Sequence, residues 1–135
     1  MAKNASATKG DDLLGEADRE FLRGVAERTV RDNARERAEL GIRLEAARGE
    51  ARRLAALLAG MPEVRRVLLF GSTATGRCYR RDSDIDLAIE GGDLLACMAV
   101  VEGSSFAVDL VEIERLPEGI RSRAREEGLL LYEKT

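Results

Sequence analysis

The sequence predicts an α/β (α+β) chain, in which a small mixed β-sheet with flanking helices follows a long N-terminal helix or helix pair. Residues 12–60 are rich in Ala, Leu, Glu and Arg and contain no proline, a composition typical of helix. After Pro62, short apolar segments alternate with helical ones, and glycines and prolines separate them. The 135 residues allow one domain with a modest core.

Composition excludes several classes of function. The 25 acids against 22 bases give a net charge of −3, which argues against a dedicated nucleic-acid binder. We find no apolar run of membrane-spanning length and no signal peptide, so we expect a cytoplasmic protein without membrane contact. Cys78 and Cys97 match no metal-binding spacing and are expected to be reduced thiols. Since there is no histidine, chemistry must rest on carboxylates, hydroxyls and arginines.

The N-terminal part divides into a polar segment, 1–11, expected to be disordered, and the helical segment 12–60. Glycines within the helical segment weaken the case for one continuous helix, and Gly60 with Pro62 should end it. One apolar stripe at helical spacing should pack on the sheet: Leu40, Leu44, Ala47, Ala51, Leu54 and Leu58.

The upstream part of this helical segment, residues 16–37, is much more polar. It is either a solvated helix or a helix that binds a partner. A lone helix of this composition should fray in water, so we expect docking. A homodimer through this helix is favoured, because symmetric pairs are the commonest oligomers. Its main apolar anchors are Phe21, Leu22, Val25 and Val30.

Residues 61–135 are expected to form the catalytic domain. The elements predicted after Pro62 are strands at 64–70, 84–90, 106–113 and 129–132, a short helix within 71–77, and helices at 93–103 and 117–128. Asp93 is a plausible N-cap. The strict alternation in 84–90 predicts a strand with Ile85, Leu87 and Ile89 in the core and the other face in water.

Asp84 and Asp86 leave the same face of the strand 84–90, about 6.6–6.8 Å apart along it. Two carboxylates so placed repel each other unless a proton or a cation lies between them, and Mg²⁺ prefers carboxylate, water and phosphate oxygens. Asp109 stands in the apolar run 106–113, where a charge is costly without a use. It either completes a three-carboxylate site or simply faces solvent.

Gly71 and Ser72 follow the first predicted strand and open a short helix. Free backbone N–H groups at such a turn bind phosphate, glycine allows close approach, and the serine adds a hydroxyl donor. We call this turn at Gly71 and Ser72 the phosphate cradle. A phosphate-binding turn one strand away from a metal site is typical of enzymes that transfer phosphoryl or nucleotidyl groups.

Two other motifs begin in this stretch but are not completed. Residues 71–78 start like a P-loop, yet Arg77 and Cys78 stand where lysine and Ser/Thr are required. Residues 82–93 start like an EF-hand loop, yet Leu87 stands at the position that must be glycine.

The stretch "LLFGSTATGRCYRRDSDIDLAIEG" (68–91), with the later "VDLV" and "REEGLLLYE", resembles the signature of the nucleotidyltransferase superfamily that includes DNA polymerase beta, in its minimal prokaryotic form. The resemblance covers about residues 62–133 and implies a nucleotidyltransferase fold. It implies that Asp84, Asp86 and Asp109 are catalytic carboxylates that hold Mg²⁺.

By the same resemblance, Gly71 and Ser72 hold the triphosphate, and Ser83 and Arg77 are assigned to nucleotide binding. One residue more than the common pattern separates Ser72 from Asp84. This extra residue leaves open which of the loop arginines contacts the phosphates. The candidates are Arg77, Arg80 and Arg81, and the alternative for all three is a charge that only faces solvent.

The resemblance further implies transfer of a nucleoside monophosphate, AMP from ATP, to a hydroxyl. Minimal nucleotidyltransferases are often antitoxins that adenylylate a tyrosine of a helical HEPN toxin, so that partner class is expected here. Two alternatives stay open: a non-catalytic module that acts by contact with a partner protein, and a free-standing enzyme that modifies a small molecule. Neither the acceptor nor the base preference can be read from the residues.

Overall fold

The computed structural model describes residues 14–135, so the segment 1–11 lies outside the described residues. Helix α2 (Glu16–Ala59) is a single helix of 44 residues, which decides between one helix and a pair. Its internal glycines do not interrupt it, because each costs only about 1 kcal/mol relative to alanine among many good helix formers. The helix ends immediately before Gly60, as predicted, and the Gly60 N–H donates to the Leu57 carbonyl at 3.1 Å.

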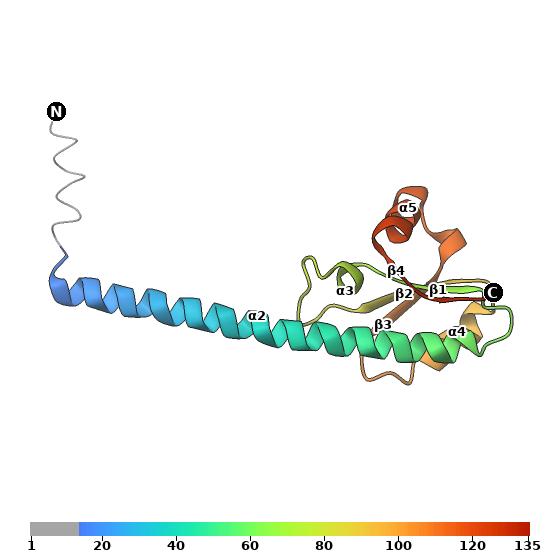
Figure 1. Cartoon of the computed structure of the whole chain (residues 1–135), viewed down its shortest axis with the longest axis horizontal. Coiled ribbons are helices and arrows are strands. Elements are labelled where there is room, and N and C mark those ends of the chain that lie inside the picture. Colours follow the sequence, from blue (N-terminus) through green and yellow to red (C-terminus); the bar gives the residue numbers. More distant parts are fainter. Residues whose placement is uncertain (1–13) are drawn as a thin grey trace, which may run out of the picture. The chain divides into compact units, whose positions relative to one another are not determined.

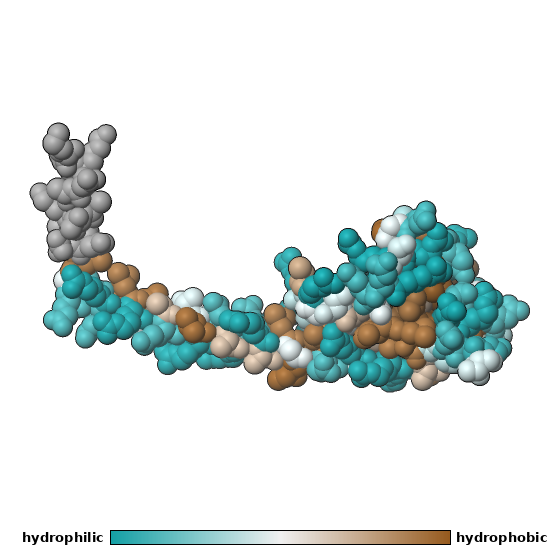
Figure 2. Space-filling model, turned by 45° about the horizontal axis from the view of Figure 1, so that its top comes forward, coloured by the Kyte–Doolittle hydropathy of each residue, from teal (hydrophilic) through white to brown (hydrophobic). Residues whose placement is uncertain are grey.

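The chain consists of two compact units, one ending at Glu39 and the other running from Leu40 to Thr135. In the first unit, the large apolar side chains of α2 are exposed: Phe21 67%, Leu22 50%, Val25 38% and Val30 65%. Figure 2 shows this part of α2 as mainly hydrophilic, with separate hydrophobic areas. These residues therefore bury little apolar surface within the chain itself.

The second unit contains a four-stranded sheet with the strand order β3-β2-β1-β4. Strands β1 and β2 are antiparallel, β1 and β4 are antiparallel, and β2 and β3 are parallel. The sheet is therefore mixed, as expected. Its strands are β1 (Arg66–Phe70), β2 (Ile85–Glu90), β3 (Val108–Glu112) and β4 (Leu129–Glu133).

Three helices connect these strands at nearly the predicted positions: α3 (Ser72–Thr75), α4 (Leu94–Val101) and α5 (Glu118–Glu127). The 3₁₀ turn η1 (Ile113–Arg115) was not predicted, and it begins at a residue that was expected to end a strand. The predicted N-cap of α4 is confirmed, because the Asp93 side chain accepts a hydrogen bond from the Leu95 N–H at 3.1 Å. None of the helices described is both long and apolar enough to cross a membrane.

The main core lies between one face of the sheet and helices α2 and α4 (Figure 1). The predicted apolar stripe supplies the α2 side, where Ala47, Ala51, Leu54 and Leu58 are buried. Strand β2 contributes its alternate residues, which are fully buried as predicted: Ile85, Leu87 and Ile89.

The opposite face of the sheet carries helix α5 (Figure 1). The prediction that strand 84–90 has one face in water is wrong, because Ala88 on this face is fully buried and Asp86 is half-buried. A second apolar cluster explains the burial. It consists of Leu68, Ala88 and Ile113, with Phe70 and Val111 packed against them. The sheet therefore has two covered faces, and Asp86 lies on the more weakly covered one.

Candidate active site

Asp86 and Asp109 face each other across the parallel pair of strands β2 and β3, at the end of the sheet where β1 stops. Asp86 is the register partner of Asp109 on one side and of Phe70 on the other. Neighbouring strands lie about 4.8 Å apart, so the two aspartates leave the same face at adjacent positions. Asp109 is exposed, and Asp84, just before β2, is exposed as well. The three predicted carboxylates thus lie at the same end of the sheet, on β2 and β3 and just before β2.

The carboxyl group of Asp86 has a raised pKa, about 6 instead of 3.8. Burial is the main cause, and the charges of Asp109 and Asp84 add to it. Both causes disfavour the carboxylate ion, because it loses hydration and meets negative neighbours. A strongly perturbed carboxyl group with charged partners at the end of a sheet is a candidate functional group.

Gly71 follows the last residue of β1 and lies directly against the Asp86 side chain. Its φ angle is 73°, a left-handed value that favours glycine. A β-carbon at this position would overlap the Oδ2 atom of Asp86 more closely than real side chains approach. Glycine is therefore required both for the turn and for the contact between the carboxyl group and the backbone that leads into α3.

Thr73, which the sequence reasoning missed, joins α3 to β2. It is fully buried, and its Oγ1 donates to the Asp84 carbonyl oxygen at 3.0 Å. The turn that begins at Gly71 is thereby tied to the residue that precedes β2. The position of this threonine, two residues after the glycine, was the only available signal in the sequence.

Ser72 is the first residue of α3, and its carbonyl oxygen accepts from the Gly76 N–H at 2.7 Å. Ser83 lies in the following loop, where its Oγ accepts from the Arg80 N–H at 2.8 Å. Its own N–H donates to the Arg80 carbonyl at 3.0 Å. Ser83 therefore shapes the turn that leads into Asp84.

The loop arginines have different surroundings. Arg77 forms an ion pair with Glu127 of α5 at 2.9 Å, and Arg80 lies 3.8 Å from Asp82. The Arg81 carbonyl accepts from Arg43 of α2 at 2.9 Å. Cys78 has a φ of 56°, which is uncommon for a residue other than glycine and is often found near functional sites. Of the three arginines, Arg77 also lines the cavity described next.

A cavity of about 780 Å³ lies between the end of β1, the loop after α3, and helix α5. Such a volume is in the range of small-molecule sites, about 300–1,000 Å³. The role of α5 as a wall of this space was not predicted, because its sequence carries no motif. The lining includes Phe70, Gly71, Arg77, Ile120, Arg123 and Glu127.

The carboxylates at this end of the sheet are chemically suited to Mg²⁺. All three candidate ligands are carboxylates, and a divalent cation would relieve the negative charges of Asp109 and Asp84, which add to the effect of burial on the pKa of Asp86. Within residues 14–135, no group of three or more His, Cys, Asp and Glu side chains is arranged so that it could hold a metal ion by itself. Water and phosphate oxygens ordinarily supply several of the ligands of Mg²⁺.

Comparison with known proteins gives a family match over the second part of the chain. The family model described as polymerase beta, nucleotidyltransferase, matches residues 52–135. A comparison with curated proteins found no match.

Several solved structures resemble part of the chain. A toxin–antitoxin crystal structure with AMP-PNP has 23% identity and a TM-score of 0.48, over 58% of this chain and 68% of that one. A tri-AMPylated HEPN toxin from Shewanella oneidensis in complex with MNT antitoxin has 18% identity and a TM-score of 0.46, over 67% and 73%. A structure described as a minimal nucleotidyltransferase has 28% identity and a TM-score of 0.44, over 64% and 93%.

Proposed function

Because this chain belongs to the polymerase beta nucleotidyltransferase family, which its residues 52–135 match, we propose that it transfers AMP from ATP to a hydroxyl acceptor with the help of Mg²⁺. The observation that carries the proposal is the pairing of Asp86 with Asp109 beside Gly71. Residues 61–135 would carry the chemistry, and the N-terminal part of 12–60 would bind a partner.

Each predicted site residue has a role in this proposal. Asp84, Asp86 and Asp109 would hold Mg²⁺, which when bound neutralises charge on the phosphates. Gly71 and Ser72 would bind the triphosphate through backbone N–H groups and the serine hydroxyl. Ser83 keeps the loop before Asp84 in its turn through its contacts with Arg80.

The cavity beside Gly71 supports the binding of a nucleotide. It begins at the cradle, and its lining offers Arg77 and Arg123 for phosphate oxygens and Phe70 and Ile120 for apolar contact. Of the loop arginines, we assign Arg77 to the phosphates, because its partner Glu127 is on the cavity wall and a phosphate can compete for the same guanidinium.

The transfer step would use the exposed carboxylate of Asp109. It accepts the proton of the acceptor hydroxyl as the hydroxyl oxygen attacks the α-phosphorus in line. A bond forms between that oxygen and the α-phosphorus, the bond from the α-phosphorus to the bridging oxygen breaks, and pyrophosphate leaves. Asp109 suits this role because it is more exposed than Asp86 and lies at its side.

The acceptor class follows from the motif resemblance given above. We propose a tyrosine hydroxyl of a helical HEPN-type protein, so that this chain acts as an antitoxin that AMPylates its partner.

The first unit supports a second partner proposal, a homodimer through residues 16–39 of α2. Its large apolar side chains are exposed, as given above. Charge is uneven along it, with four acids and two arginines in 16–27 but four arginines and three acids in 28–39. An antiparallel pairing of two copies places the acidic half of one helix against the basic half of the other, which favours association.

Calorimetry with ATP, with and without Mg²⁺, tests the proposed function. We expect binding to be at least about tenfold tighter with the metal, a difference of about 1.4 kcal/mol. Asp84→Asn should abolish the difference. The matched control is Asp82→Asn, in the same loop and with a side chain 86% exposed, which should retain it. Equal affinity for ATP in both conditions would overturn the metal-bridged site.

A further inference from the structure

Arg48 of helix α2 binds the short helix α3 through its guanidinium group. Its Nε donates to the Thr73 carbonyl at 2.9 Å, and its Nη2 donates to the Ala74 carbonyl at 3.0 Å. The side chain is only 22% exposed, although it also pairs with Glu45 at 3.2 Å. One guanidinium thus satisfies two consecutive carbonyl groups with the planar fork geometry that only arginine offers.

Helix α3 needs such support, because it has only four residues. Its own backbone supplies three hydrogen bonds, from the N–H groups of Ala74 and Thr75 to the Gly71 carbonyl and from Gly76 to Ser72. A single turn is not stable alone, and the carbonyls at its end need external donors. Arg48 supplies those donors together with a positive charge, which is favourable at a helix C-terminus.

The same part of α2 also contacts the two segments that precede the catalytic carboxylates. Arg43 donates to the Arg81 carbonyl at 2.9 Å, in the loop before Asp84, and its guanidinium lies 5.3 Å from the centre of the Phe106 ring. Glu50 accepts a hydrogen bond of 2.5 Å from the Ser104 hydroxyl, in the segment before β3 and Asp109.

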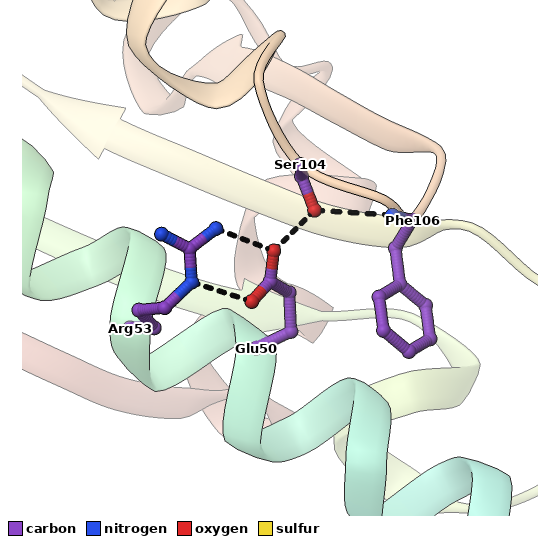
Figure 3. A network of polar contacts seen from close by, with 4 residues as sticks. All are labelled: Glu50, Arg53, Ser104 and Phe106. Carbon is purple, nitrogen blue, oxygen red and sulfur yellow. Dashed lines mark hydrogen bonds and ion pairs between the residues drawn. The ribbon is translucent and has the colours of Figure 1, made fainter.

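Figure 3 shows how this second contact is fixed on both sides. Arg53 binds the Glu50 carboxylate through two nitrogens, each at 2.7 Å, and the Phe106 N–H donates to the Ser104 Oγ at 3.1 Å. Residues 43–50 therefore contact the cradle, the loop before Asp84 and the segment before Asp109, all from one helix.

We propose that Arg48 is a positioning residue for nucleotide binding: it holds α3 so that Gly71 and Ser72 keep their place beside Asp86. This inference rests on the proposed function. In this role Arg48 acts through α3, because Nε and Nη2 donate to the Thr73 and Ala74 carbonyls and Nη1 donates to Glu45.

The test compares four variants of the full chain: Arg48→Ala, Arg48→Lys, Glu45→Gln and Arg52→Ala. Glu45→Gln removes the ion pair but keeps both carbonyl contacts, and Arg52→Ala removes an exposed arginine of the same helix. Two quantities are measured, the affinity for ATP with Mg²⁺ by calorimetry and the amide hydrogen exchange of residues 72–76 without nucleotide.

Arg48→Ala should weaken ATP binding about tenfold relative to Arg52→Ala and speed exchange at Ala74, Thr75 and Gly76 about tenfold, while residues 54–58 keep their protection. Arg48→Lys should recover part of both, because it keeps the charge but not the fork. If Arg48→Ala does not fold, Arg48→Lys measured against Glu45→Gln decides the same question.

Unchanged exchange at 72–76 in the Arg48 variants would overturn the inference. So would ATP affinity equal to that of the controls, which would leave Arg48 with a merely structural role. Failure of the proposed function looks different, because the unmodified protein would then not bind ATP at all. The exchange measurement, made without nucleotide, would still decide whether Arg48 holds α3.

Discussion

Gly71 and Asp86 are in direct contact: the Oδ2 atom of Asp86 occupies the space that a β-carbon at position 71 would need. The contact connects the two halves of the proposed site, the turn after β1 and the acidic pair on β2. A substitution at Gly71 is therefore expected to displace the carboxyl group as well as to strain the turn.

Gly71→Ala should destabilise the protein by about 1–3 kcal/mol, because φ is 73° and the methyl group meets Asp86. It should also abolish Mg²⁺-dependent ATP binding. The control is Gly41→Ala in α2, where a β-carbon meets nothing within 4 Å. That variant should stabilise the helix by about 0.5–1 kcal/mol, since alanine is the better helix former. Thermal unfolding and calorimetry measure both effects, and a Gly71→Ala variant that binds ATP normally would contradict the arrangement.

Asp86→Asn should abolish transfer and leave the protein as stable as before or more stable at pH 7. The pKa of Asp86 is raised from 3.8 to about 6, so in the folded state the carboxylate is disfavoured relative to the unfolded chain. Below pH 3.8 the group is neutral in both states and costs nothing. As pH rises from 3.8 to 6, the unmodified protein should lose stability relative to the variant, and above pH 6 the difference should be constant. Unfolding of the variant at neutral pH would indicate that Asp86 is a structural residue.

Glu50→Gln should lower the free energy of unfolding at pH 7 by about 1.5–3 kcal/mol, the usual range for hydrogen bonds to a charged group. The bond from Arg53 and then the bond from Ser104 hold the pKa of Glu50 at about 2, below its ordinary 4.5. The stabilisation is therefore present above pH 4.5 and is lost as pH falls towards 2. Glu45→Gln, at a residue whose side chain is 66% exposed, should cost less than about 1 kcal/mol. Denaturant unfolding between pH 2 and 7 compares the two, and equal losses would contradict the special role of Glu50.

Deletion of residues 1–37 should leave a folded second unit that still binds nucleotide but has lost the dimer. The core residues of α2 begin at Ala47, beyond the deletion. Light scattering on the full-length and shortened proteins measures the mass of each. Phe21→Glu in the full chain should weaken the dimer in the same way, because Phe21 is the most exposed of its four apolar anchors. A monomeric full-length protein would show that the helix does not pair with a second copy.

Much of the second unit could be predicted from local pattern. The alternation of Ile85, Leu87 and Ile89 indicated the core face of β2, and the acid before Leu94 indicated the N-cap of α4. These features depend on neighbouring residues alone, so a sequence pattern is sufficient. The buried state of Ala88 was missed because it depends on Leu68 and Ile113, which only the folded sheet brings to the same place.

The candidate site residues could be proposed from the sequence motif, but the residues that support them could not. Asp86 and Gly71 were identified from type and spacing, whereas their direct contact required the antiparallel pairing of β1 with β2. Arg48 looked like one more charged residue of a polar helix. Its contact with Thr73, 25 residues later, leaves no periodic signal in the sequence.

Mass spectrometry of a helical HEPN-type protein, after co-expression with this chain, tests nucleotidyl transfer most directly. The proposal predicts that a tyrosine of that protein gains the mass of an adenylyl group with the unmodified chain. It predicts no gain with Asp86→Asn or Asp109→Asn and a full gain with the loop control Asp82→Asn. An unmodified partner, or the same adenylylation in the presence of the Asp86 and Asp109 variants, would contradict the claim that these carboxylates transfer AMP.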